Sequence, residues 1–232
     1  MQLYRNKRLI KRNKFMGRLM MFGGLGASFA AVIIVFLQPS YLALAFGLML
    51  AGGLFSQLGT AIHNRFGRSP RIDQILEDSL KGFDDTYALF HYYLGTHHAL
   101  FTPAGAFALI PRDEQGEVLF ESNQWIHKPS KRKFGRRRKP LKDLERIAAR
   151  ETKSMKKALT KKFPNRSEIP VDPLLVFIAS DTTVSAEGSP TLAAHRKKLK
   201  PYLRRLERWK SFSTEEIHQL AATFSISPDD TD

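Results

Sequence analysis

The stretch that decides the fold is residues 19–64, LMMFGGLGASFAAVIIVFLQPSYLALAFGLMLAGGLFSQLGTAIHN, which contains no Asp, Glu, Lys or Arg. The sequence Gln38-Pro39-Ser40 divides it into two apolar segments, 19–37 and 41–62. Each is long enough to cross roughly 30 Å of hydrocarbon as a helix that rises about 1.5 Å per residue. Because lipid offers the backbone no hydrogen-bond partners, we expect two transmembrane helices joined as a hairpin, with the lipid bilayer as their partner.

Basic residues flank both outer ends of this hairpin, whereas the connecting turn carries no charge. By the positive-inside rule both termini would be cytoplasmic, which predicts a multi-pass protein of the inner (cell) membrane. Neither span contains a charged residue, which favours an anchor over an ion path. The flanking residues are Arg5, Lys7, Arg8, Lys11, Arg12, Lys14 and Arg18 before the first span, and Arg65, Arg68 and Arg71 after the second.

Small residues recur at four-residue spacing within the spans, as Gly24/Ser28, Gly47/Ala51 and Gly52/Ser56. Such pairs allow two helix backbones to approach closely. Hairpin packing and oligomer contacts explain them equally well. A cleaved secretory signal is disfavoured because a second span follows the first at once, and a buried soluble hairpin is disfavoured by the length of the uncharged stretch.

The composition excludes several classes of site. The 232 residues include 37 Lys+Arg and 22 Asp+Glu, which gives a net charge of +15, and no Cys. Disulfide frameworks, thiolate zinc sites and cysteine nucleophiles are therefore excluded. The charge pattern predicts a basic cytoplasmic N-terminus (1–18), the hairpin (19–64), a globular cytoplasmic domain (65–224) and an acidic tail (225–232).

Periodicity within residues 65–224 predicts an α/β or α+β domain, in which helices flank one mixed sheet. We expect strands at 86–93, 98–102, 106–110, 117–121 and 173–179. The expected helices are 73–81, 140–162 with Pro140 at its start, 191–209 with a bend at Pro201, and a last helix that opens at Ser213 with a capping box.

A basic loop lies between the predicted strands and the second helix, and it is the strongest candidate for binding a polyanion. Three interpretations remain open for it: attraction to anionic lipid headgroups, contact with nucleic acid phosphates, or a solvated loop. Phe134 is its only aromatic residue, which gives little support for base stacking. The loop residues are Lys128, Lys131, Arg132, Lys133, Arg136, Arg137, Arg138 and Lys139.

His91, His97 and His98 form the one histidine cluster of the sequence. If 98–102 is a strand, alternation places His97 on one face with Ala99 and His98 on the other. The two side chains would then not chelate one ion together. We therefore expect packing or surface histidines, no metal site and no cofactor.

The element order and several local strings resemble the nuclease-related domain (NERD) family, a branch of the restriction-endonuclease-like PD-(D/E)xK superfamily. The resemblance covers roughly residues 67–224. It depends on the segment from His97 through Pro103-Ala104-Gly105-Ala106-Phe107 to Arg112, on the later Gly116 and Trp125, and on the Ser-Thr-Glu-Glu-Ile sequence that starts at residue 213. The resemblance implies a restriction-endonuclease-like mixed sheet flanked by helices.

The metal-binding positions of that family depart from its pattern here. The alignment places His97 at the Asp position, Ile110 at the Glu position and Arg112 at the Lys position, and leaves Glu77 on the first helix. An apolar side chain cannot ligate Mg²⁺, and an Arg stays protonated and cannot act as a base. Asp113 and Glu114 could replace the lost ligand but resemble ordinary turn residues.

The sequence therefore predicts a membrane-anchored pseudonuclease that binds a polyanion or a protein partner without cleaving it. One alternative is a divergent, Mg²⁺-dependent nuclease at the membrane. Another is a structural subunit of a membrane complex, with a membrane-protein partner.

Overall fold

The computed structural model describes residues 1–130, 138–163 and 170–206, together with 213, 215–216, 218–219 and 222, and it is of mixed α/β class. The chain divides into two compact units. The smaller unit, Asn6–Ile72, is the helical hairpin. The larger unit joins Met1–Arg5 to the described residues from Asp73 onward.

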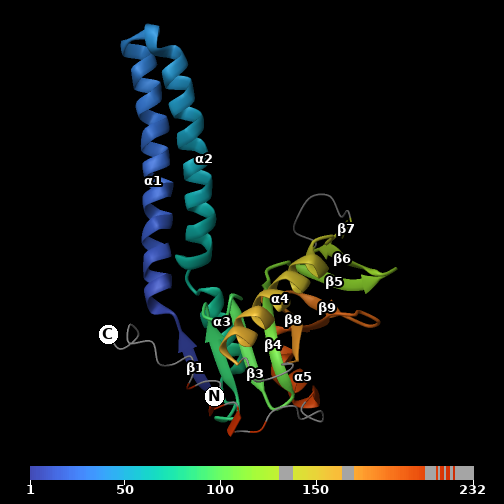
Figure 1. Cartoon of the computed structure of the whole chain (residues 1–232). Coiled ribbons are helices and arrows are strands. Elements are labelled where there is room, and N and C mark those ends of the chain that lie inside the picture. The colour runs from blue at the N-terminus through green and yellow to red at the C-terminus, as the bar shows by residue number, and fades with distance from the viewer. Residues whose placement is uncertain are drawn as a thin grey trace. The chain divides into compact units, whose positions relative to one another are not determined.

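The hairpin consists of α1 (Lys7–Leu37), a 3₁₀ turn η1 (Pro39–Tyr41) and α2 (Leu42–Phe66), and the two long helices run antiparallel (Figure 1). Their most apolar windows have mean hydropathies of 2.3 and 1.7, so both helices are long and apolar enough to cross a membrane. The turn lies where the sequence predicted it. Both helices continue into the basic flanks, because Lys and Arg are good helix formers.

Small residues at seven-residue spacing form the contact between α1 and α2. Gly17, Gly24 and Ala31 are the buried small residues of α1, and Ala45, Gly52 and Gly59 those of α2. A Cβ atom at Gly59 would lie 2.2 Å from the backbone nitrogen of Met21, so the two backbones are in direct contact. The predicted pair Gly47/Ala51 takes no part in this contact, since both residues are exposed.

The main sheet of the larger unit has six strands in the order β1-β2-β3-β4-β8-β10. Strands β2 to β4 are antiparallel neighbours, whereas β1 pairs with β2, β8 with β4, and β10 with β8 in parallel. The bounds are β1 (Gln2–Arg5), β2 (Ala88–His91), β3 (His98–Thr102), β4 (Gly105–Arg112), β8 (Val171–Phe177) and β10 (Leu192–His195).

The prediction of one mixed sheet is wrong, because β5 and β6 pair with each other and not with β4, and they form a second sheet of four strands in the order β7-β6-β5-β9. Its centre is the antiparallel hairpin of β5 (Gly116–Glu121) and β6 (Gln124–Pro129), with β7 (Lys139–Pro140) and β9 (Thr183–Ser185) at the edges. The hairpin turn at Ser122 and Asn123 has positive φ at both residues, as the twist of a tight hairpin requires.

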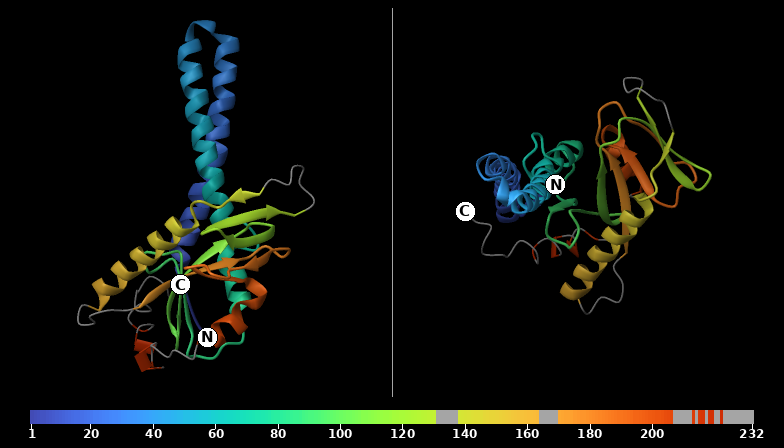
Figure 2. Two further views of the ribbon diagram at one scale, coloured as in Figure 1. Left: turned by 90° about the vertical axis from the view of Figure 1, so that its right-hand side faces the viewer. Right: turned by 90° about the horizontal axis from the view of Figure 1, so that it is seen from above.

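Helix α4 (Leu144–Lys162) lies across the main sheet (Figure 2), and α3 (Ile72–Leu80) packs on the opposite face. Met155 and Leu159 of α4 join Phe90, Ala99 and Phe101 in one buried cluster. Because strand side chains alternate, the neighbours of these residues, His91, His98 and Leu100, point to the α3 face.

Three predicted elements differ from the structure. Residues 191–209 are not one helix, because β10 is followed by a 3₁₀ turn η2 (Arg196–Lys198) and α5 (Leu199–Leu206). Pro140 pairs with Ile126 in β7, so α4 begins four residues later than predicted. Residues 2–5, predicted as part of a basic N-terminal segment, form the edge strand β1. The capping box is confirmed, since the Ser213 and Glu216 side chains each accept the other residue's backbone N–H, at 3.2 and 2.8 Å.

Candidate functional site

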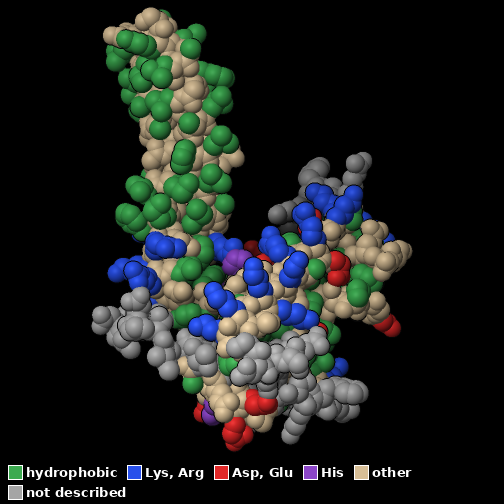
Figure 3. Space-filling model, in the orientation of Figure 1, with side chains coloured by type: hydrophobic (Ala, Val, Ile, Leu, Met, Phe, Trp, Pro, Cys, Tyr) green, Lys and Arg blue, Asp and Glu red, His purple; other side chains and the backbone are tan. Residues whose placement is uncertain are grey.

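The outer face of α4 is a row of exposed cations. Leucine, alanine and methionine on the inner side of the helix bury it against the sheets, and Lys and Arg occupy the outer side. Figure 3 shows these basic side chains following the helix. We call this set the α4 basic face: Arg146, Arg150, Lys153, Lys156, Lys157, Lys161 and Lys162.

The two carboxylates of α4 are directed toward the rest of the unit. Glu145 accepts hydrogen bonds from Trp125 Nε1, at 2.9 Å, and from the Thr191 hydroxyl. Glu151 is buried and accepts the Thr96 hydroxyl at 2.9 Å, and the His97 Nδ1 lies 3.2 Å away. Glu145 and Glu151 therefore connect α4 to other parts of the unit, and they neutralise little of the positive charge on the α4 basic face.

The charge of the α4 basic face is open to solvent along most of its length. Arg146 pairs with Asp143 at 2.8 Å, and Arg150 reaches Glu151 at 3.2 Å. Lys153, Lys156 and Lys157 have no ion-pair partner within the described ranges. A row of uncompensated cations attracts phosphate groups, and the attraction weakens as salt rises.

Most of the predicted basic loop lies outside the described residues, namely Lys131, Arg132, Lys133, Arg136 and Arg137. Its described members are at the loop ends. Lys128 pairs with Glu117 at 3.0 Å, and Arg138 with Glu121 at 3.3 Å. These two cations stabilise the β5–β6 hairpin, whereas Lys139 is exposed on β7.

The structure separates the residues that the nuclease resemblance aligned. His97 contacts Glu151 on the α4 face, and Ile110 is buried beside Leu144 of α4. Arg112 is held by Glu114, with Nε 3.2 Å from the carboxylate. Glu77 belongs to the α3 face and does not meet any of them. The expectation that His97 and His98 point to opposite faces is confirmed, because His98 contacts His91, with the two Nδ1 atoms 2.7 Å apart.

Glu77 is part of a buried polar network on the α3 face. Arg5 donates to both of its oxygens, from Nη2 at 2.5 and 2.6 Å, and its Nε lies 3.6 Å from the buried Asp73. The Nε2 of His91 lies 3.3 Å from Glu77. Burial alone would raise the pKa of Glu77, but hydrogen bonds and charge from His91 and Arg5 outweigh it and lower the pKa. The carboxylate is therefore ionised and fully engaged.

The His97–Glu151 contact is the equivalent polar contact of the α4 face. Burial opposes ionisation of Glu151, but hydrogen bonds from His97, Thr96 and Arg150, with the charge of His97, lower its pKa to about 2. Glu151 is therefore a carboxylate across the physiological range. Its partner His97 has a side chain that is 36 % exposed.

Two of these features escaped prediction. Arg5 lies 72 residues before Glu77, and no local pattern connects them. The α4 basic face had a visible signal in Arg146, Arg150, Lys153 and Lys157, which recur at helical spacing.

Within the described ranges no three His, Asp or Glu side chains lie close enough together to hold a metal ion. Comparisons of the chain with models of protein families, with curated proteins and with solved structures gave no match.

Proposed function

We propose that this chain is an inner-membrane protein whose cytoplasmic unit binds anionic phospholipid headgroups through the α4 basic face. The observation that carries the proposal is the division of charge on α4: seven cations face outward, and both carboxylates of the helix contact other parts of the unit. Each cation near an anionic surface contributes about 1 kcal/mol.

The connectivity supports two membrane crossings with both termini on one side. The chain leaves the larger unit at Arg5 and returns to it at Asp73, and β1 pairs with β2 in one sheet. The two ends of the hairpin must therefore lie in the same compartment. The Lys and Arg residues at those ends favour the cytoplasm as that compartment.

Two features favour a lipid surface over nucleic acid. α4 contains no aromatic residue on which a base could stack. The connections are also short: α1 begins at Lys7, directly after Asn6, and α3 begins six residues after α2 ends at Phe66. A unit tethered by both ends to a membrane hairpin stays within reach of the headgroups.

The larger unit would be a nuclease-like scaffold that does not cleave its ligand. The order α3, β2 to β4, α4 and β8 agrees with the order that the family resemblance implies. Ile110 offers no oxygen to a metal, Arg112 is engaged by Glu114, and Glu77 is engaged by Arg5. A fold of this kind with those substitutions would bind without catalysis.

The lipid contact is testable with one fluorescent probe, because the protein has no native Cys. The full chain carrying Ala149→Cys, at an exposed position of α4, is labelled and placed in nanodiscs that contain a headgroup quencher. We expect strong quenching of the probe in anionic discs and weak quenching in zwitterionic discs. The quenching in anionic discs should be lost at high salt. A probe at Ser122→Cys, in the β5–β6 turn, serves as the positional control.

A matched pair of variants distinguishes the effect of the α4 lysines from the effect of positive charge elsewhere on the protein. Lys153→Gln/Lys156→Gln/Lys157→Gln should abolish the difference between anionic and zwitterionic discs. Lys81→Gln/Lys139→Gln/Lys197→Gln removes the same charge from other exposed positions, and it should preserve the difference in quenching between anionic and zwitterionic discs. Equal quenching in both lipids for the unaltered chain would overturn the proposal.

Nucleic acid binding and cleavage are the competing outcomes. The same nanodiscs are incubated with DNA or RNA and with Mg²⁺ or Mn²⁺, and we expect the nucleic acid to stay intact. Salt-sensitive DNA or RNA binding that depends on the three lysines would assign the α4 basic face to nucleic acid. Cleavage that Glu77→Gln or Asp113→Asn abolishes would identify a divergent nuclease.

A further inference from the structure

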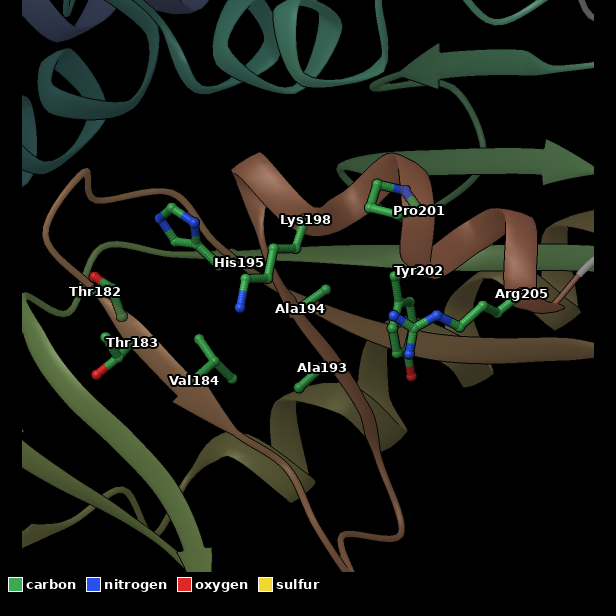
Figure 4. Close-up of a pocket in the computed structure, with 10 residues that line it drawn as sticks. All are labelled: Thr182, Thr183, Val184, Ala193, Ala194, His195, Lys198, Pro201, Tyr202 and Arg205. Atoms are coloured by element: carbon green, nitrogen blue, oxygen red, sulfur yellow. The ribbon is translucent and has the colours of Figure 1, made fainter.

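A cavity of about 390 Å³ lies between β9, β10 and the η2–α5 segment, within the larger unit (Figure 4). It is formed where the edge strand of the four-stranded sheet meets the edge strand of the six-stranded sheet. None of its lining residues belongs to α4 or α3. The volume is in the range of sites that hold small organic molecules.

The charged side chains that line this cavity are both basic. Lys198 comes from η2 and Arg205 from α5, and the lining residues that the structure describes include no carboxylate. Neither side chain has an ion-pair partner in the part of the chain that the structure describes. In Figure 4 the Lys198 side chain extends from η2 toward the strands. Two uncompensated cations around a concave space are the usual arrangement for a phosphate or carboxylate ligand.

The remaining polar groups favour binding over catalysis. His195 Nε2 lies 2.8 Å from the Ala179 carbonyl oxygen, and its Nδ1 accepts the Lys197 N–H at 3.4 Å. Both ring nitrogens of His195 therefore contact the backbone. Burial raises the pKa of Tyr202, so its hydroxyl stays protonated. The Thr182 hydroxyl donates to the Glu114 carbonyl oxygen.

Apart from Thr183, the rest of the wall is apolar or aromatic: Val184, Ala193, Ala194, Pro201 and the ring of Tyr202. An inorganic anion would leave this surface uncovered. A ligand with an anionic group joined to a flat or apolar group would use both parts of the cavity.

We propose that this cavity binds an organic monophosphate, with its phosphate at Lys198 and Arg205 and its organic part against Val184, Pro201 and Tyr202. The site is separate from the α4 basic face, and the proposal does not depend on membrane or polyanion binding. Charge-assisted contacts to the phosphate would supply most of the affinity.

The test is calorimetric titration of the full chain, in a phosphate-free maltoside detergent, with adenosine monophosphate as the probe. Saturable binding is expected, and Lys198→Met or Arg205→Met should weaken it by about tenfold or more, the effect of losing one charge-assisted contact. Adenosine, which lacks the phosphate, should bind at least about tenfold more weakly. Inorganic phosphate should also bind more weakly than adenosine monophosphate.

Lys197→Met is the matched control, because Lys197 is the exposed neighbour of Lys198 and does not line the cavity. It should change the affinity by less than about twofold. Thr183→Trp, at an exposed lining position, should block the cavity without changing the charge. The proposal is overturned by absence of saturable binding at millimolar probe, by equal losses in Lys197→Met and Lys198→Met, or by adenosine or inorganic phosphate binding as tightly as the nucleotide.

Discussion

The hairpin and the larger unit differ in the side chains through which their helices pack. In the hairpin, α1 and α2 meet through glycines and alanines, and the contact is backbone against backbone. In the larger unit, α3 and α4 meet the sheet through apolar clusters supplemented by partly buried polar contacts, such as Arg5–Glu77 and His97–Glu151. Helices in an apolar medium gain little from burying apolar side chains and depend on close fit, whereas helices in water gain from both.

The largest expected effect concerns the close fit of the hairpin. Gly59→Leu should force the helices apart, because its side chain would meet backbone atoms of Met20 and Met21 that have no freedom to move. We expect a cost of about 3 kcal/mol. Spin labels at Phe29→Cys and Phe46→Cys, both outward-facing, should report a longer and broader interhelical distance.

Gly47→Leu is the control for this substitution, since nothing lies within 4 Å of a Cβ atom at residue 47. It should leave the distance distribution unchanged. A shift with Gly47→Leu and none with Gly59→Leu would mean that the helices pack through the face that carries Gly47 and Ala51, and not through the face that carries Gly59.

The second effect concerns the network on the α3 face. Arg5→Met removes the guanidinium that pairs with Glu77, and it also removes the Arg5 contact to Asp73, which is fully buried. Removing one partner of a partly buried pair is costly, and we expect a loss of about 2 kcal/mol in the free energy of unfolding. Denaturant titrations followed by tryptophan fluorescence, which includes buried Trp125, provide the measurement.

Lys11→Met removes the same charge from an exposed position of α1 and should have little effect. Arg5→Met/Glu77→Met should recover part of the loss, because one unpaired charge is removed with its partner. If Arg5→Met is no more harmful than Lys11→Met, β1 contributes to the sheet through its backbone alone.

The third effect is a pH dependence on the α4 face. The pKa of Glu151 is lowered from 4.5 to about 2 in the folded protein. Its contribution to stability is therefore fully present above pH 4.5 and is lost as the pH falls toward 2. Since His97 is partly exposed and solvent screens the pair, we expect about 1–2 kcal/mol.

Glu151→Gln should lower the free energy of unfolding at pH 7. It should also reduce the fall of that free energy as the pH is lowered from 5 to about 3, measured by denaturant titration at each pH. Glu121→Gln, at an exposed residue that pairs with Arg138, should keep the decline of the unaltered protein. An unchanged acid slope in Glu151→Gln would assign the decline to other carboxylates.

The smallest effect on stability should come from the α4 basic face itself. Lys153→Gln/Lys156→Gln/Lys157→Gln should change the free energy of unfolding by no more than about 0.5 kcal/mol, since exposed positions without partners contribute little. Thermal unfolding of the full chain in detergent provides the comparison. A large loss would show that these lysines serve the fold, which would weaken the proposal that they serve a ligand.

Sequence predicted the elements whose pattern is local. The local pattern alone is sufficient to predict the apolar strands β3, β4 and β8. It is also sufficient for the hairpin, which is one long uncharged stretch. Residues 192–195 were predicted as helix because Leu-Ala-Ala has high helix propensity, yet pairing with β8 overrides it. The register of the hairpin contact also depends on the partner helix, since this stretch contains glycines on several faces.

The candidate site was predictable only in part. The cationic spacing in α4 is present in the sequence, but the inward direction of Glu145 and Glu151 depends on Trp125, Thr191 and His97. Likewise the cavity beside Lys198 exists because β9 and β10, edge strands of different sheets, come together. Contacts between segments far apart in the chain have no local signature.

The parallel pairing of Gln2 with Ala88 has a consequence for how the protein is made. The first strand to be synthesised must wait for a partner 86 positions later, and closing so long a loop costs conformational entropy. Antiparallel association of α1 and α2 brings the two ends of the intervening segment together in advance. Assembly of the glycine-rich helix pair would thus act as a folding aid for the sheet, and damage to it should slow the refolding of the β1 edge.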